Sequence, residues 1–248
     1  MGPLTGRGAV VTGADQPLGR GLTLALGAAG AALTLIGDPA TLAPVTADLD
    51  HRDVSAVAVA APLTDRAALE QGVAAAADRL DAPVRAVVHA AMPAAAFERV
   101  AFDDVDDDRL DTVWEGTMRA ALAVLQASHT LLSGRDGRIV LVTPTVSMSG
   151  APGLVPYAAA VEGQRLLAKS AARQWGSDRI TVNCLAPSPE LVPIGVTSGD
   201  ASLAPAALGG PGDPEADLGP ILVFLAGDDS HFVTGVTVCA DGGVWMAP

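Results

Sequence analysis

Aromatic residues are scarce in this sequence. They account for 3% of the 248 residues, and Tyr157 is the only tyrosine. Half of the residues are nevertheless hydrophobic and only 17% are charged, which excludes an intrinsically disordered chain. A sizeable core is therefore available, and it has to be packed with aliphatic side chains instead of rings.

Cysteine is almost absent as well: the chain has two, Cys184 and Cys239. They form no C-x-x-C pair and no cluster with histidine, so neither a disulfide framework nor a metal site is indicated. Both lie in apolar, strand-like runs, where we interpret them as small buried side chains in a reducing compartment. We expect no bound metal.

Basic residues are fewer than acidic residues in this sequence. The chain has 15 lysine and arginine residues against 28 aspartate and glutamate residues, a formal net charge of −13. This balance argues against a surface for nucleic acid or anionic membranes, both of which attract basic patches. No charged leader with an apolar stretch opens the sequence, and no run is suited to spanning a membrane. We expect a cytoplasmic protein.

Short apolar runs alternate with longer helical stretches along the chain. The strand-like runs are Gly8–Thr12, Leu33–Ile36, Val54–Ala60, Val84–His89, Arg138–Thr143, Ile180–Leu185 and Val236–Cys239. The helical stretches are Leu18–Ala29, Asp65–Leu80, Asp108–Leu132, Pro156–Trp175 and Pro214–Leu225. The first four runs show almost no polar–apolar alternation, which is typical of strands buried on both faces of a parallel sheet. This order predicts an α/β fold with a doubly wound parallel sheet, a Rossmann fold, in which residues 1–248 form a single domain.

Two segments fall outside this alternation. Residues 187–212 are rich in proline and glycine and weakly periodic, and a loop of this length in a compact domain is usually a lid or a binding element. The acidic run Asp103–Asp108 comes before a predicted helix. Carboxylates there cap free N–H groups and complement the helix dipole, so we interpret this run as a solvated cap.

A glycine-containing turn follows the first strand, with the sequence Thr12-Gly13-Ala-Asp-Gln-Pro17-Leu-Gly19. A strand, a glycine turn and a helix start form the usual cradle for a dinucleotide, because backbone N–H groups and the helix dipole receive the pyrophosphate. Pro17 lacks an N–H group and brings a ring to a place where the backbone has to approach phosphate closely. The turn therefore predicts a weakened cradle.

The same turn resembles the Thr-Gly-x-x-x-Gly-x-Gly pattern of the short-chain dehydrogenase/reductase family, with Pro17 in place of the middle glycine. Two further segments are similar to that family: Ile180–Pro187 resembles its sixth strand, and Phe224–Gly243 resembles its C-terminal signature. The resemblance covers nearly the whole chain. It implies the Rossmann fold and, for an intact member, an NAD(P)-dependent oxidoreductase.

Positions that the resemblance assigns to the cofactor have mostly changed. Asp38 lies one position later than the family's acidic residue for the NAD ribose, and Pro62-Leu63 replaces the pair that holds the adenine. In the loop after the fourth strand, Met92 adds bulk where a glycine normally admits the cofactor. We therefore predict a degraded site that binds NAD(P) weakly or not at all. The residues assigned to it are Gly13, Gly19, Asp38 and His89.

The catalytic set has changed further. The resemblance implies a tyrosine for proton transfer, a lysine four residues later, a serine thirteen residues earlier and an asparagine on the preceding long helix. The corresponding residues are Tyr157, Val161, Pro144 and Thr117. A lysine ammonium stabilises the tyrosine phenolate, and Val161 carries no charge that could do so. Tyr157 is therefore either a surviving acid/base group or a residue kept for packing or a hydrogen bond.

Three functions are consistent with this pattern. The chain is a non-catalytic subunit in a heterodimer or heterotetramer with an active paralogue, a divergent NAD(P)-dependent oxidoreductase that uses Tyr157, or a non-redox enzyme or ligand-binding protein that reuses the pocket. We favour the first, because the segments that family members use for assembly remain while the site positions are replaced. Those segments are 108–132, 156–175 and 234–248. The candidate contact residues, whose sheet-facing and partner-facing sides spacing alone does not separate, are Leu122, Leu125, Leu166 and Leu167.

Overall fold

One parallel sheet organises the molecule. The computed structural model describes residues 2–193 and 204–246, and within them seven strands lie side by side in the order β3-β2-β1-β4-β5-β6-β7. The strands are β1 (Gly8–Thr12), β2 (Ala32–Ile36), β3 (Ala56–Val59), β4 (Val84–His89), β5 (Arg138–Val142), β6 (Thr181–Pro187) and β7 (Thr237–Ala240). Each neighbouring pair is parallel. The predicted doubly wound α/β fold is confirmed.

The central strands form because they are apolar towards both faces of the sheet. Every residue of β1, β5 and β6 is buried, and their valine and isoleucine side chains suit a pleated, enclosed position. β3 and β7 are the two edge strands and are only partly buried. The core therefore has two layers, one on each face of the sheet.

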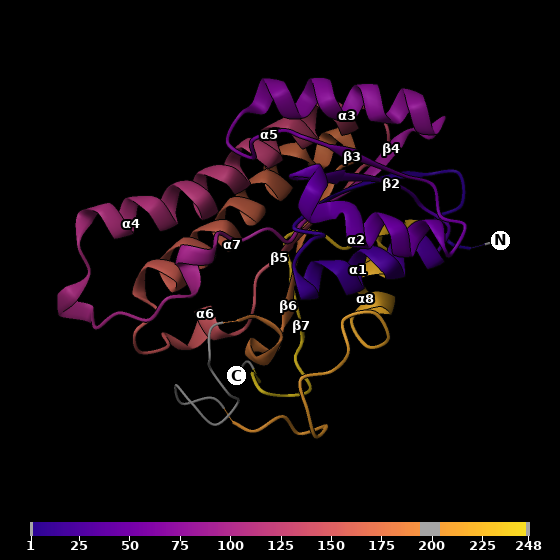
Figure 1. The fold of residues 1–248 in the computed structure, drawn as a ribbon. Coiled ribbons are helices and arrows are strands. Elements are labelled where there is room, and N and C mark those ends of the chain that lie inside the picture. Colours follow the sequence, from indigo (N-terminus) through magenta and orange to yellow (C-terminus); the bar gives the residue numbers. More distant parts are fainter. Residues whose placement is uncertain (1, 194–203, 247–248) are drawn as a thin grey trace.

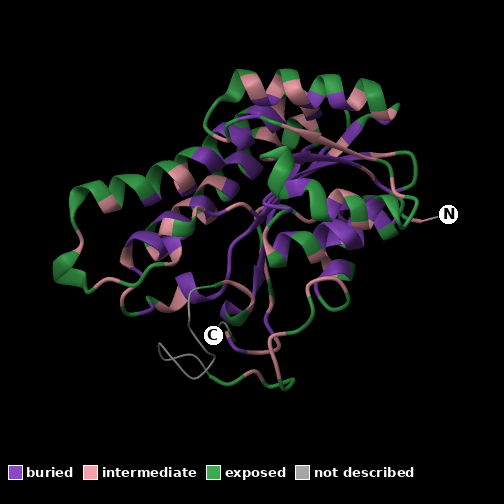
Figure 2. Ribbon diagram, viewed as in Figure 1, coloured by how far each residue is buried: buried purple, intermediate pink, exposed green. Residues whose placement is uncertain are grey.

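Helices cover both layers (Figure 1). On one face, α1 (Pro17–Ala28), α2 (Pro39–Asp50) and α8 (Gly219–Ala226) contribute leucines to one buried cluster. On the other face, α3 (Arg66–Leu80), α5 (Ala120–Leu132) and α7 (Val155–Trp175) surround a second cluster. Figure 2 shows the resulting pattern, with buried residues along the strands and the inward sides of the helices. None of the described helices has the length and hydropathy that a bilayer crossing requires.

The long helix predicted before the fifth strand has three parts. α4 (Asp107–Trp114) passes into a π-helical turn, Glu115–Arg119, which continues into α5. Asp106 caps α4, because its carboxylate accepts a hydrogen bond from the Arg109 N–H at 2.8 Å. The interpretation of the acidic run as a cap is thus confirmed at this residue. A π-turn inside a helix often marks a functional position, and this one contains Thr117.

Two helices differ from the sequence prediction. The prediction contains no helix at α2, yet Pro39 is tolerated in its first turn and Asp38 caps it, with the carboxylate accepting from the Ala40 N–H at 2.9 Å. α8 begins at Gly219 instead of Pro214. The residues before it form turns, in which the Asp213 carboxylate accepts hydrogen bonds from two backbone N–H groups. Such local bonds compete with a helix.

The predicted loop 187–212 is irregular in the parts that the structure describes. A single 3₁₀ turn, Pro189–Leu191, follows β6, and residues 204–212 contain only turns and bends. Residues 194–203 of this predicted loop lie outside the described residues.

Candidate cofactor and active site

The strand order reverses between β1 and β4. Such a reversal leaves a crevice at the carboxyl ends of the strands, where doubly wound proteins bind ligands. A cavity of about 360 Å³ lies at this place. Its lining comes from the segments after β1, β2, β3 and β4 and from the long helix. The lining residues are Gly13, Asp15, Gln16, Ile36, Gly37, Leu63, Thr64, Ala91, Met92, Pro93, Gly116 and Ala120.

Gly13 and Gly19 are required by local packing. Gly13 has a φ of +76°, and a Cβ atom there would lie 2.6 Å from the backbone nitrogen of Ala91. A Cβ atom on Gly19 would lie 2.0 Å from the Gly13 carbonyl oxygen. Both distances are far shorter than a van der Waals contact, so the turn needs glycine at both positions whether or not a cofactor binds.

The turn between these glycines has lost part of its capacity to hold phosphate. Pro17 occupies the first turn of α1, which tolerates proline because that N–H group has no partner within the helix. The N–H group that a phosphate would use is thereby absent. The Gln16 side chain donates a hydrogen bond from Nε2 to the Met92 carbonyl oxygen at 2.7 Å. This bond ties the loop after β1 to the loop after β4.

Asp38 and His89 have structural partners. Asp38 is the exposed cap of α2. His89 ends β4 and is fully buried, with Nδ1 2.8 Å from the Thr12 hydroxyl and Nε2 without a partner in the described part of the chain. Burial lowers the pKa of His89 to about 4, so the imidazole is neutral at pH 7. Of the four predicted cofactor residues, only Gly13 lines the cavity.

Tyr157 lies in the first turn of α7, and its side chain is completely buried. The ring centroid is 6.1 Å from that of Phe97. The hydroxyl has no hydrogen-bond partner among the described residues, and burial raises the pKa of the phenol far above its ordinary value. Its buried apolar neighbours are Met92, Ala96, Val113, Val146, Ala151, Leu154, Val161 and Val244.

The lysine and serine positions offer no polar group to Tyr157. Val161 follows one helical turn later and is fully buried in the same apolar cluster. Pro144 is buried, and its carbonyl oxygen accepts a hydrogen bond from the Ser147 hydroxyl at 3.0 Å. The neighbouring Thr145 hydroxyl donates to a backbone carbonyl on β6 at 3.2 Å. Val161 and Pro144 themselves thus carry no group for proton transfer.

No basic side chain of α7 takes the place of the missing lysine. Arg165 has Nη1 3.4 Å from the Glu162 carboxylate, and Lys169 lines a groove beside β7. Thr117, at the asparagine position, is fully buried; its carbonyl accepts from Gln164 Nε2 at 3.0 Å, and its hydroxyl has no partner. Of the four catalytic positions, Tyr157 and Val161 thus share one apolar cluster.

Comparison with known proteins identifies the family. The family model described as enoyl-(acyl carrier protein) reductase matches residues 13–245, nearly the entire chain. The protein belongs to the short-chain dehydrogenase/reductase family. Its relatives include an NADPH-dependent aldehyde reductase-like protein, chloroplastic, from Arabidopsis thaliana, which is 29% identical over 97% of this chain and 95% of its own length. The short-chain dehydrogenase/reductase eriH from Hericium erinaceus is 28% identical over 95% of this chain and 96% of its own length.

Solved structures of this family have the same architecture. A protein from Sinorhizobium meliloti 1021 assigned as a short-chain alcohol dehydrogenase superposes with a TM-score of 0.82 at 28% identity, covering 97% of each chain. Levodione reductase, at 21% identity, shares the fold with a TM-score of 0.83. The chain therefore has the fold of an NAD(P)-dependent oxidoreductase of the short-chain dehydrogenase/reductase family.

The residues present fit the family's nicotinamide cofactor poorly. Asp15 is the one charged residue in the lining of the cavity, which includes no lysine or arginine to neutralise a pyrophosphate. Met92 is buried where the cofactor would pass, and its carbonyl is already bound by Gln16. A larger cavity of about 700 Å³ lies between the loop at 208–212 and the segment after β7, and its lining contains none of the four catalytic positions.

Two residues that close the site are not indicated by the sequence. Phe97, from the 3₁₀ turn Ala94–Phe97, and Val244, after β7, both pack against the cluster around Tyr157. In the sequence they lie about 60 and 90 positions from Tyr157, and no motif or spacing predicts that they pack near it. The sequence signal for this packing is the apolar character of Val161 and Met92, which is typical of core positions.

Proposed function

We propose that this protein is the non-catalytic subunit of a hetero-oligomeric NAD(P)-dependent dehydrogenase or ketoreductase, in which an active paralogue carries out the reaction. The observation that carries the proposal is Tyr157, whose hydroxyl is buried without a partner while Val161 fills the lysine position. A hydroxyacyl-CoA or similar acyl thioester is the substrate class we propose for the assembly. The family description supports it, because an enoyl group on acyl carrier protein is an acyl thioester.

The cofactor cradle supports the same proposal. Pro17 removes an N–H group, and Asp15 places a negative charge beside the position of the pyrophosphate. Repulsion between this carboxylate and the phosphates is not offset by a basic side chain in the lining. We therefore propose that the isolated chain binds NAD(P) weakly or not at all.

A surface suited to a partner lies on the long helices. Outward-facing apolar side chains follow α4 and α5, and Leu166 of α7 is 65% exposed. Leu125 and Leu167 instead pack into the cluster between helices and sheet. The helices are held together where Gly163 of α7 faces the Met118 side chain. An apolar patch shared by adjacent helices is typical of an interface. The exposed members are Leu110, Trp114, Leu122 and Leu166.

The proposal is tested by co-expression with an intact relative encoded nearby, one that retains the tyrosine and lysine. Native mass measurement and light scattering are expected to give a mixed dimer or tetramer whose activity depends on the relative's tyrosine. The assembly should remain active when this chain carries Tyr157→Phe. A stable monomer, or a homotetramer that does not bind the relative, contradicts the proposal.

A divergent oxidoreductase that works through Tyr157 is the second candidate. It is favoured by the full-length match to proteins named as reductases. The isolated chain is assayed with NADH and NADPH over a broad panel of ketones, aldehydes and alcohols. Under our proposal no turnover rises above background. Turnover that disappears in Tyr157→Phe supports the second candidate.

A further inference from the structure

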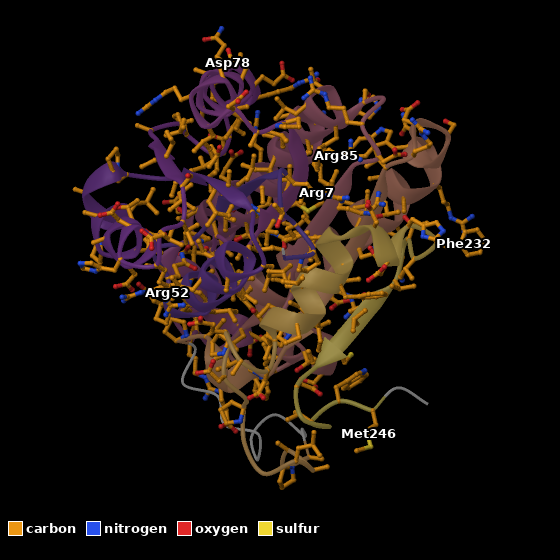
Figure 3. The ribbon with its side chains drawn as sticks, turned by 90° about the vertical axis from the view of Figure 1, so that its right-hand side faces the viewer. Arg7, Arg52, Asp78, Arg85, Phe232 and Met246 are labelled. Atoms are coloured by element: carbon orange, nitrogen blue, oxygen red, sulfur yellow. The ribbon has the colours of Figure 1, made fainter. Side chains whose placement is uncertain are left out.

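A basic cluster lies at the amino ends of the strands, away from the site described above. Its ion pairs join Arg7 to Asp228, Arg179 Nε to Asp136 Oδ1 at 2.9 Å, Arg138 Nη2 to Asp228 Oδ1 at 3.7 Å and Arg85 Nη2 to Asp136 Oδ2 at 3.8 Å. Four guanidinium groups thus surround two carboxylates. Arg7 and Arg85 lie on the face turned toward the viewer in Figure 3. The cluster keeps a positive charge in a chain with a net charge of −13.

A cavity of about 290 Å³ opens beside this cluster, between the loops that lead into β6 and β7. Its polar lining residues are Asp136, Arg138, Arg179, Thr181, His231 and Thr234. Arg138 is 3% exposed, yet it lines the cavity with a full positive charge. Burying such a charge costs free energy unless opposite charges or hydrogen-bond acceptors compensate it. The groups around Arg138 therefore determine which ligand the cavity can bind.

Hydrogen-bond donors in this lining remain unused. Thr181 is 7% exposed, and its hydroxyl has no partner. The Thr234 hydroxyl accepts from the Val182 N–H at 3.1 Å, which leaves its own proton available. Arg138 donates from Nε and Nη1 to backbone carbonyls, whereas Nη2 makes no hydrogen bond to a described residue. A buried donor without an acceptor costs free energy, and a bound acceptor would recover it.

The electrostatic surroundings favour an anion. Burial lowers the pKa of Arg138, Asp228 and Asp136 raise it, and Arg7 and Arg85 lower it to a smaller extent. An adjoining groove of about 440 Å³ shares Thr234 with the cavity and is lined by Lys169 and Arg173. Neither of these two cations forms an ion pair with a described residue. No carboxylate lines that groove.

We infer that this cavity binds a small tetrahedral oxyanion, phosphate or the phosphate end of a larger molecule, between Arg138, Arg179 and the hydroxyls of Thr181 and Thr234. Oxygen atoms of such a group accept from guanidinium and hydroxyl donors, and charge-assisted bonds of this kind are the strong ones. A purely structural role accounts for Arg138 Nε, which donates to the Gly227 carbonyl after α8, and for Nη1, which donates to the Asp136 and Gly137 carbonyls before β5. That role does not explain the Thr181 hydroxyl, which has no partner among the described residues. It also does not explain Lys169 and Arg173, which line the groove beside Thr234.

The test is a calorimetric titration of the full chain with inorganic phosphate, at an ionic strength held constant with chloride. Saturable binding is expected. Arg179→Gln removes a charged donor and should weaken binding at least about tenfold. Thr181→Val keeps the shape of the side chain and should weaken binding several-fold without impairing folding, because it deletes an unpaired buried hydroxyl. Arg66→Gln, on the exposed face of α3, removes the same charge elsewhere and should bind phosphate like the unmodified chain.

Absence of saturable binding up to about 10 mM phosphate overturns the inference. So does unaltered binding in both cavity variants, since phosphate would then sit elsewhere, for example at the glycine turn. Circular dichroism of each variant shows that it is folded before binding is compared. A parallel titration with methyl phosphate identifies the source: equal affinity indicates the phosphate end of a larger molecule, and binding of inorganic phosphate alone indicates an enclosed free ion.

Discussion

Tyr157 occupies the family's catalytic tyrosine position, and its surroundings are those of a packed core residue. A free phenol with a pKa of about 10 needs roughly 4 kcal/mol to lose its proton at pH 7. Burial in the apolar cluster adds to that cost, and Val161 provides no charge to reduce it. The ring instead fills space between α7 and Phe97. The Tyr157 side chain fills space in the core, and its hydroxyl has no hydrogen-bond partner among the described residues.

Tyr157→Phe is therefore expected to leave the fold intact and to raise the free energy of unfolding by about 1 kcal/mol, because an unpaired buried hydroxyl is removed. Urea denaturation measures the change. The comparison variant is Val161→Ala, which opens a cavity in the same cluster and should lower the free energy of unfolding by about 2 kcal/mol. A loss of stability in Tyr157→Phe would mean that the hydroxyl has a partner and that the site is not the apolar interior described here.

His89 predicts a pH dependence of stability. Its pKa is about 4 in the folded chain and about 6.5 when unfolded. Between these values the unfolded state binds the extra proton, so the contribution is complete above about pH 6.5 and is lost as the pH falls towards 4. Lowering the pH from 7 to 5 should reduce the free energy of unfolding by about 2 kcal/mol through this residue.

Urea titrations at both pH values, compared with His89→Asn, isolate this contribution. The variant should lose most of the 2 kcal/mol difference, whereas His51→Asn, at an exposed position after α2, should keep it. An equal pH dependence in all three proteins would show that His89 takes up its proton as readily folded as unfolded.

At the scale of elements, the sequence predicted most strands and the long helices because buried parallel strands and amphipathic helices have clear periodic patterns. It failed at α2, where two prolines concealed a helix that Asp38 caps. It also did not separate Leu122, which faces outward, from Leu125, which packs against the sheet. The two are three residues apart in α5 and lie about 60° from each other around the helix, so the boundary between its exposed and sheet-facing sides passes between them, and sequence spacing does not locate that boundary.

The turn between β1 and α1 sets the expected affinity for cofactor. Calorimetric titration of the isolated chain with NADH and NADPH should give dissociation constants weaker than about 10 µM, near −7 kcal/mol. Pro17, Asp15 and the bond from Gln16 to Met92 are the causes. Pro17→Gly should not restore tight binding, because Asp15 and Met92 remain. A constant tighter than about 10 µM for the unmodified chain would show that the cradle tolerates these residues.

At the scale of the whole molecule, the family's fold is present, whereas most of the family's catalytic residues are replaced. The strands, both helical layers and the glycine turn are specified by residues that pack well. Buried side chains from four parts of the chain fill the space around Tyr157, while a cavity of about 360 Å³ remains beside the turn after β1. Sequence motifs indicated the loss of catalytic groups. The packing around Tyr157 could not be predicted from the sequence, because it depends on residues such as Phe97 and Val244 that no motif includes.

The surface of α4, α5 and α7 carries the prediction for assembly. In the complex with an intact relative, Leu122→Glu and Leu166→Glu should each weaken association by about 2 kcal/mol or more, roughly thirtyfold in Kd, because a buried carboxylate would face apolar side chains. Both positions are exposed in the isolated chain, so the variants should fold normally. Leu208→Glu alters a still more exposed leucine on the loop before α8 and should leave association unchanged. Analytical ultracentrifugation of the mixed proteins measures all three. If only Leu208→Glu dissociates the complex, the partner binds at the C-terminal side, and the long helices are not its docking surface.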